Sequence, residues 1–227
     1  MSKTSKASVP PGLLFISENI KSKQNIIGAP KSEKAKWAKG IQFSDNKDTI
    51  FFAGCGYQYS SALESMMLLI KKTEKSVLGA DLVMGFASSF QKKLGINVGD
   101  MYRKVMTREN EDEAKPLKDA VKVLNNLGIE FGYLGEEEPC CGGLLYYSGL
   151  REDFAKNADE TYNKLKSFGV KKIIGIVPSC TYSLKTLLSE YVKDTDIEVR
   201  HFAEVVMENI SKKALRYPGE AVKVTLS

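Results

Sequence analysis

Two adjacent cysteines, Cys140 and Cys141, followed by two glycines, are the residues of this chain best suited to chemistry. A single buried cysteine packs as a small hydrophobic residue, but two in succession point in different directions and cannot both fill one cavity. The other two cysteines, Cys55 and Cys180, each follow an apolar stretch beside glycine or proline. Four thiolates gathered at one point suit a soft metal ion or an iron–sulfur cluster. The chain has no Cys-x-x-Cys pair, which argues against a zinc ribbon, a thioredoxin-type motif or a ferredoxin-type run.

The segments around these cysteines alternate between strand and helix patterns. Strands are expected at 49–53, 129–134, 172–177, 197–201 and 222–226, and helices at 13–20, 33–40, 116–127, 151–168, 182–191 and 203–212. This alternation predicts an α/β fold with a mostly parallel sheet flanked by helices. Ligands gather at the carboxyl ends of parallel strands. Because Cys55, Cys140 and Cys180 each follow a predicted strand, we expect them to lie close together.

The chain is expected to divide into an N-terminal arm and one domain. Residues 1–46 form the arm, which contains the only tryptophan, Trp37, and wraps the domain or a neighbouring molecule. Residues 47–227 form the domain. Within it, residues 60–108 repeat apolar side chains at helical spacing and are interpreted as a helical insertion.

The composition is that of a globular protein, with 43% hydrophobic and 27% charged residues and a formal net charge of +5. No run approaches the roughly 18 apolar residues of a membrane span, and no apolar region follows the first lysines, so we expect neither a span nor a signal peptide. Thiols without secretion signals favour a reducing compartment. A cytoplasmic location follows, including the periphery of a membrane complex. Lysines 156–166 alternate with acidic residues, which predicts a solvated surface rather than a nucleic-acid face.

Three stretches of the chain resemble the CCG cysteine-rich domain, which occurs in the B and D subunits of heterodisulfide reductases. The same domain occurs in iron–sulfur subunits of glycolate, lactate and glycerol-3-phosphate oxidation. The three stretches are residues 51–55, 134–142 and 173–180. The resemblance extends to the residues around His201 and to the arm around Trp37, and it leaves out residues 60–108.

By this resemblance, Cys55, Cys140, Cys141 and Cys180 are the ligands of one cluster of the [4Fe–4S] type, with cubane and non-cubane forms both open. The resemblance implies an oxidoreductase subunit that transfers electrons and needs other redox subunits for activity. Those partners would be a second CCG-type chain, a ferredoxin-like subunit or a flavin subunit. His201, the only histidine, is a candidate proton donor or ligand near the cluster, with a capping or packing role as the alternative.

The chain departs from the family pattern in ways that bear on the cofactor. Val177 stands where the family has the first cysteine of a Cys-x-x-Cys pair, so four thiols remain and a five-cysteine cluster is not expected. Family members usually carry two such domains in tandem, whereas this chain has one and stops at Ser227, where the predicted strand 222–226 would lead into a second. We interpret the chain as a split subunit of a larger redox complex, with a fragment of a longer chain as the alternative.

Two other functions are open from the residues alone. A zinc ion satisfied by four thiolates at about 2.3 Å would make the domain a structural assembly module. A vicinal pair at Cys140 and Cys141 would also suit a thiol–disulfide enzyme, because strained disulfides are reactive. The three glutamates at 136–138 before the pair are expected to form a solvated turn.

Overall fold

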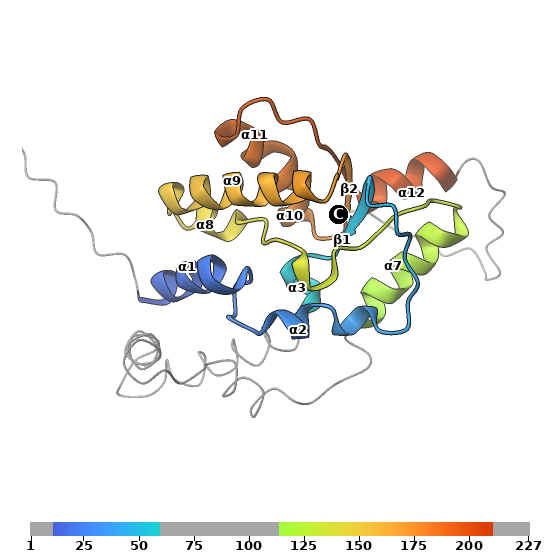
Figure 1. Ribbon diagram of the computed structural model, residues 1–227, viewed down its shortest axis with the longest axis horizontal. Coiled ribbons are helices and arrows are strands. Elements are labelled where there is room, and N and C mark those ends of the chain that lie inside the picture. Colours follow the sequence, from blue (N-terminus) through green and yellow to red (C-terminus); the bar gives the residue numbers. More distant parts are fainter. Residues whose placement is uncertain (1–10, 60–113, 211–227) are drawn as a thin grey trace, which may run out of the picture.

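The computed structural model describes residues 11–59 and 114–210, and these form three layers around a parallel sheet (Figure 1). In this part of the chain the sheet has three strands, in the order β1–β2–β3. They are β1 (Thr49–Phe52), β2 (Lys172–Gly175) and β3 (Glu198–His201). Both pairs are parallel. The predicted α/β fold with a parallel sheet is therefore confirmed.

The carboxyl ends of the strands lie level with one another. Phe52 at the end of β1 pairs with Gly175 at the end of β2, and Gly175 in turn pairs with His201 at the end of β3. The segments that leave β1 and β2 therefore start from the same edge of the sheet. Cys55 and Cys180 both lie in these segments.

Successive residues of the strands pack alternately into two hydrophobic cores on opposite faces of the sheet. Ile50 and Ile173 are fully buried in one core, and Phe51 and Ile174 are fully buried in the other. Helices cover both faces, as Figure 1 shows. The first core includes side chains from α9 (Arg151–Ser167), α10 (Pro178–Tyr182), the π-helical turn η4 (Ser183–Leu187) and α11 (Leu188–Tyr191), together with Ile20 and Leu145. The second includes side chains from α7 (Lys115–Asn126) and α12 (Phe202–Ile210), together with Trp37.

Residues 11–46, called the arm below, lie against the rest of the described chain through polar as well as apolar contacts. The arm contains α1 (Pro11–Lys23), α2 (Lys31–Lys34) and the short 3-10 helix η1 (Lys36–Ala38). Trp37 is buried, and its indole N–H donates to the Tyr133 hydroxyl at 2.9 Å. Asp153 on α9 accepts from the Ser17 hydroxyl at 2.6 Å and pairs with Lys21 at 2.8 Å. These contacts fix α1 and η1 at separate points of the domain.

The predicted strand at 129–134 was wrong. This segment forms only one parallel bridge, between Ile50 and Gly132. The chain at residues 44–46 crosses the other side of Gly132 so closely that an added Cβ would lie 2.9 Å from the Asn46 carbonyl oxygen and 3.1 Å from that of Ser44. Gly132 is thus held between β1 and the chain at residues 44–46, and the segment pairs with β1 at this one position.

The predicted helix at 182–191 begins earlier, at Pro178, so Cys180 lies in a first helical turn rather than in a loop. Proline is favoured at this position because its missing N–H would have no partner there. Short helices also contain or flank the other cysteines. Cys55 lies in α3 (Gly54–Gln58), and the Cys140–Cys141 pair lies between η3 (Gly135–Glu137) and α8 (Gly143–Tyr147).

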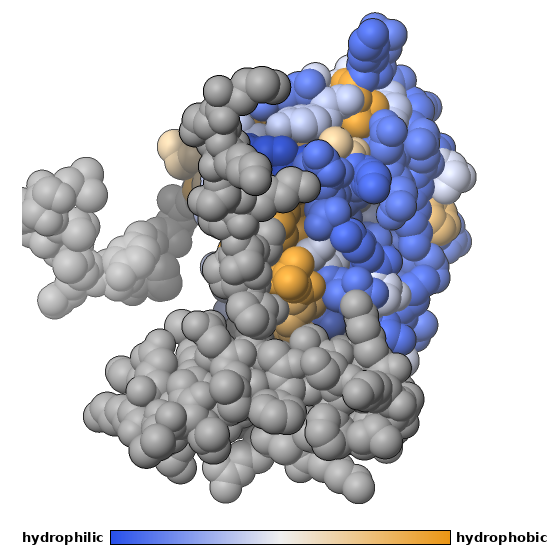
Figure 2. Space-filling model, turned by 90° about the vertical axis from the view of Figure 1, so that its left-hand side faces the viewer, coloured by the Kyte–Doolittle hydropathy of each residue, from blue (hydrophilic) through white to orange (hydrophobic). Residues whose placement is uncertain are grey.

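The predicted helical insertion at 60–108 and the predicted strand at 222–226 lie outside the described residues. Among the described helices, none has the length and apolar character needed to cross a membrane. On the face drawn in Figure 2, the described surface is mostly hydrophilic with small hydrophobic patches. The lysines of α9 contribute to a solvated surface of mixed charge, with Lys164 paired to Glu137 and Lys166 paired to Asp196.

Candidate metal centre

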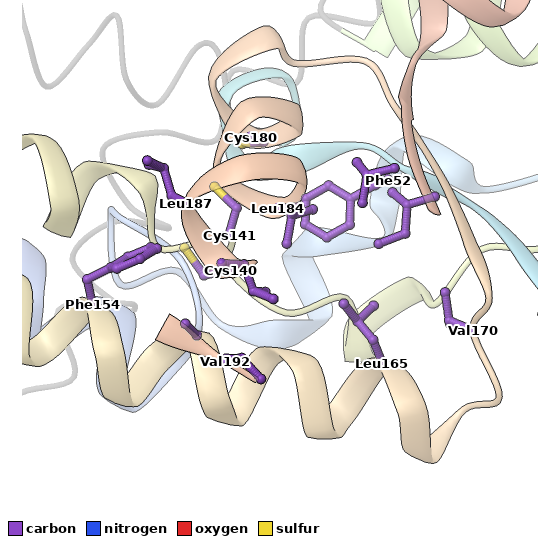
Figure 3. Close-up of a cluster of buried hydrophobic side chains, with 14 of the residues drawn as sticks. Phe52, Cys140, Cys141, Phe154, Leu165, Val170, Cys180, Leu184, Leu187 and Val192 are labelled. Atoms are coloured by element: carbon purple, nitrogen blue, oxygen red, sulfur yellow. The ribbon is translucent and has the colours of Figure 1, made fainter. Parts of the chain in front are cut away.

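The four cysteines come from three segments that meet at one edge of the sheet. Cys55 lies in α3 after β1, Cys180 lies in α10 after β2, and Cys140 and Cys141 lie in the loop between η3 and α8. Cys140, Cys141 and Cys180 are buried, and Cys55 is half-buried. Figure 3 shows the side chains of the three buried cysteines together within the hydrophobic core. All four have free thiols.

The thiols contact one another in a closed ring. Cys55 contacts Cys140 and Cys180, and Cys141 contacts the same two residues. These side-chain interactions bring the four thiols next to one another, and their role as ligands of one centre stays a prediction. Within residues 11–59 and 114–210, no three His, Cys, Asp or Glu side chains are placed around one point as ligands of a single metal ion.

The ring concentrates negative charge at Cys140. Thiols of Cys141 and Cys55 donate to its sulfur, and these bonds outweigh burial and hold its pKa well below the usual value. The pKa values of Cys55 and Cys141 are raised, chiefly because each donates to Cys140. The pKa of Cys180 is raised first by its bond to Cys141. The contacts in the ring thus lower the pKa of Cys140 and raise those of the other three cysteines.

Backbone N–H groups of the paired glycines point at the sulfur atoms. Gly142 donates to Cys140 and Gly143 donates to Cys141. Gly142 has a φ of 70°, and an added Cβ would lie 2.4 Å from the amide nitrogen of Asn157. Only glycine fits this position without strain and a clash. Hydrogen bonds of this kind to sulfur raise the reduction potential of iron–sulfur sites.

Val177 lies next to the turn at Gly54, directly before Cys55. An added Cβ at Gly54, which has a φ of 67°, would lie 3.0 Å from a methyl group of Val177 and 3.1 Å from the Cys180 sulfur. The half-buried valine and the cysteine therefore border the same side of the Gly54 turn. Val177 thus lies beside the thiol ring.

Side chains from three elements hold the main chain of the vicinal pair, and sequence reasoning missed all of them. Asn157 and Thr161 on α9 donate to the Cys140 carbonyl oxygen at 3.0 and 2.9 Å. Ser183 donates to the Cys141 carbonyl oxygen at 2.7 Å. From the arm, the side-chain oxygen of Gln24 accepts from the Cys140 N–H at 3.0 Å. Asn157 and Thr161 are polar residues four apart on the buried face of α9, which is the signal that could have identified them.

Glu138 is buried, which contradicts the solvated turn expected for residues 136–138. Its carboxylate accepts from the main-chain N–H groups of Ala53 and Gly54, both at 2.9 Å, and from the Gln58 amide at 2.8 Å. Burial raises the pKa of Glu138 to about 7 against the opposing effects of Lys34 and these donors. The carboxylate therefore ties the turn after β1 to the cysteine loop.

Glu136 and Glu137 do follow the expectation of a solvated turn. Glu136 is exposed, and the half-exposed Glu137 pairs with Lys164 and Lys31. The Lys164 pair holds the pKa of Glu137 below its usual value.

Lys34 of the arm is buried with 2% exposure, directly beneath the cysteine loop. Its ammonium donates to the main-chain carbonyl oxygens of Glu138 and, at 3.2 Å, Gln24. Burial lowers the pKa of Lys34, and the electrostatic attraction of Glu138 and Cys140 opposes that shift.

Both ring nitrogens of His201 are engaged by the main chain. Nδ1 accepts from the Ala203 N–H at 3.2 Å at the start of α12, which leaves Nε2 to donate to the Ile176 carbonyl oxygen at 3.2 Å. This arrangement caps α12 and links it to the segment after β2. A role near a cluster stays a prediction.

Residues 105–185 match the CCG cysteine-rich domain. The resemblance drawn from the sequence is therefore confirmed over this segment, which includes Cys140, Cys141 and Cys180 and leaves Cys55 outside.

Curated relatives support the same resemblance. The chain is 31% identical over 119 residues to an EtfAB:quinone oxidoreductase of Syntrophomonas wolfei, which is 52% of this chain and 16% of the relative. It is 33% and 34% identical over 103 residues to the dihydromethanophenazine:CoB–CoM heterodisulfide reductase subunits D of Methanosarcina mazei and Methanosarcina acetivorans, which is 42% of this chain and 24% of each relative. The matched region thus spans a quarter or less of each relative. No solved structure matches.

Proposed function

We propose that this chain is an iron–sulfur electron-transfer subunit of a heterodisulfide-reductase-like redox complex. One cluster of the [4Fe–4S] type would be held by Cys55, Cys140, Cys141 and Cys180. The observation that carries the proposal is the closed ring of four thiols at the carboxyl edge of a parallel sheet.

The donor set fits such a cluster in three respects. All four ligands are thiols, the usual ligands of iron–sulfur clusters. The N–H groups of Gly142 and Gly143 are directed at two of the sulfurs. Burial of Cys140, Cys141 and Cys180 excludes water from most of the ring. A bound cluster would supply reversible one-electron transfer.

The residues around the ring would position the ligands. Asn157, Thr161 and Ser183 hold the two cysteine carbonyls, so the vicinal pair has a fixed main-chain conformation before any metal binds. Glu138 holds the turn that presents Cys55. Rigid ligands keep the geometry of a redox site similar in both oxidation states, which favours electron transfer over ligand exchange.

The relatives support a place in a larger assembly. Two of them are named as a subunit of a heterodisulfide reductase, and the third as an EtfAB:quinone oxidoreductase. The electron would pass to or from a second CCG-type chain, a ferredoxin-like subunit or a flavin subunit. A cytoplasmic site, including the periphery of a membrane complex, is part of the proposal.

Metal analysis after anaerobic purification tests this function. We expect about four irons and four sulfides per chain, together with an EPR signal on reduction. Cys141→Ser should abolish both. Leu144→Ser, a change to serine at an exposed position on α8, is the matched control and should leave both intact.

The same analysis separates the alternatives. About one zinc and no iron would exclude electron transfer at this site and leave a structural assembly module. A colourless protein without metal that exchanges thiols through the vicinal pair would instead support a thiol–disulfide enzyme.

A further inference from the structure

Of the described lysine, arginine, aspartate and glutamate side chains, two are buried, and both lie beside the cysteine ring. They are Lys34, with 2% exposure, and Glu138, also with 2% exposure. Removing an ammonium group from water costs several kcal/mol, so a buried lysine is retained where negative charge compensates it. The negative charge that compensates Lys34 must therefore come from the groups around the cysteine ring.

The hydrogen bonds of Lys34 place its charge next to Cys140. One acceptor is the carbonyl oxygen of Glu138, two residues before Cys140 in the chain. The other is the carbonyl oxygen of Gln24, whose side chain accepts from the Cys140 N–H. Both acceptors are neutral main-chain groups, so they orient the ammonium without neutralising it.

The carboxylate of Glu138 is committed to other donors. Its two oxygens accept from Ala53, Gly54 and Gln58, each within 2.9 Å. Lys34 is attracted to this carboxylate and also to Cys140 and Cys55, while Lys164 repels it. The charges that face Lys34 are thus Glu138, the cysteines and the partly exposed Lys164, which is itself paired with Glu137.

We propose that Lys34 is the buried counter-charge of the cysteine-bound centre. Four thiolates outweigh the positive charge of a zinc ion or an oxidised iron–sulfur core, so the loaded site is anionic. The ammonium of Lys34 stabilises this anion, and stabilises it more after one electron has been added. Lys34 is therefore a positioning residue for charge, set in the arm rather than in the cysteine-rich segment.

The redox part of this inference rests on the proposed function. One electron enters from an external one-electron donor, such as a reduced flavin or a reduced cluster of a partner. No bond is formed or broken at Lys34, which keeps its protons. The negative charge of the centre grows by one unit on reduction. Because the ammonium of Lys34 stabilises this more negative state, the reduction potential is higher than it would be without Lys34.

Cobalt binding to the full-length, metal-free protein tests the charge without any iron. Cobalt(II) reports thiolate coordination through its charge-transfer absorption. We expect Lys34→Met and Lys34→Gln to weaken cobalt binding about tenfold, as expected for one unit charge acting at short range inside a protein. Lys31→Met, which removes an exposed lysine from the same short helix, should change it less than about threefold because solvent screens that charge.

A redox titration followed by EPR tests the second half. A tenfold effect on a one-electron equilibrium corresponds to about 59 mV, so both neutral variants should lower the midpoint potential by about that amount. Lys34→Gln keeps a donor for the Glu138 carbonyl and separates the charge from the hydrogen bond. If this variant equals the wild type while Lys34→Met does not, the lysine acts by hydrogen bonding alone and the inference is overturned.

Other outcomes are also decisive. Equal losses in the Lys31 and Lys34 variants would overturn a specific counter-charge. If neither neutral variant folds by circular dichroism, Lys34→Arg decides: cobalt affinity within about threefold of the wild type supports the charge, and a tenfold loss overturns it. A protein that takes up no iron would refute the proposed function, while the cobalt comparison would still test whether Lys34 stabilises the anionic metal site.

Discussion

The hydroxyl of Ser183 lies 2.7 Å from the main-chain carbonyl oxygen of Cys141, and Ser183 is fully buried. Ser183 begins the π-helical turn that follows α10, the helix of Cys180. The bond therefore joins the segment of Cys180 to the loop of Cys140 and Cys141. π-Helical turns occur often at functional sites, because the widened turn redirects the side chains around it.

Replacing Ser183 by alanine should loosen this junction. The Cys141 carbonyl would lose its buried donor, which costs about 1–3 kcal/mol. We expect a loss of unfolding free energy in that range and faster loss of bound metal to a chelator. Ser189→Ala removes an exposed hydroxyl bonded to its own helix and should change stability by less than about 0.5 kcal/mol. Equal effects of the two changes would contradict a specific role of the Ser183 hydrogen bond to Cys141.

Gly142→Ala should be far more damaging than Gly149→Ala. Both glycines have positive φ values, 70° and 78°, so both variants bear the left-handed strain of about 1–2 kcal/mol. Only at Gly142 would the new Cβ meet a neighbour, the Asn157 amide at 2.4 Å; at Gly149 nothing lies within 4 Å. Denaturant unfolding measures the difference, and iron content shows whether the site survives. Similar losses in both variants would mean that the contact with α9 is not critical.

Val177→Cys should place a fifth thiol beside the ring. The valine side chain borders the Gly54 turn next to the Cys180 sulfur. We expect the EPR spectrum of the iron-loaded protein to change its g values, because the new thiol lies within reach of the site. Ile176→Cys is the control, since Ile176 packs in the core on the opposite face of the sheet. A spectrum unchanged by either substitution would show that Val177 does not border the cluster.

Acidification should weaken the polar contact between α1 and α9. Burial raises the pKa of Asp153, but hydrogen bonds from Lys21 and Ser17 outweigh that effect and lower it below 3.8. A lowered carboxyl pKa contributes stability above the unfolded pKa, and this contribution is lost as the pH falls through the folded value. Asp153→Asn should therefore cost about 0.5–1 kcal/mol at pH 7 and progressively less below pH 4. Unfolding curves at several pH values measure this.

The exposed neighbour Glu152 provides the control for that experiment. Glu152→Gln removes the same charge from the same helical turn and should leave stability nearly unchanged at pH 7. A cost for Asp153→Asn that did not depend on pH would assign the effect to packing rather than to the ion pair.

Most of the architecture was predictable because it follows from local patterns. The apolar run 49–53 and the glycine after residue 168 gave the strand and helix boundaries closely. The segment 129–134 was mistaken for a full strand because its apolar pattern is strand-like, whereas a crossing chain at Ser44 and Asn46 limits its pairing. A contact between segments more than 80 residues apart leaves no mark in a local pattern.

The sequence indicated which cysteines form the candidate site, but it did not indicate the side chains that hydrogen-bond the main chain around them. Cysteines are rare, and their positions after predicted strands indicated that they would meet. The side chains that hydrogen-bond the main chain of the vicinal pair belong to common residue types, such as Gln24, Thr161 and Ser183. Their role can be recognised only when the fold brings them to the cysteine loop. Glu138 was misjudged for the same reason, because its donors lie about 85 residues earlier in the chain.

The contacts of the arm have a practical consequence for anyone who dissects this protein. The family match begins at residue 105, but Cys55, Gln24 and Lys34 all precede that boundary. A recombinant piece trimmed to residues 105–185 would lack one corner of the thiol ring and both strands that pair with β2, namely β1 and β3. The homologous unit and the folding unit therefore have different borders, and an inactive excised domain would say little about the intact chain.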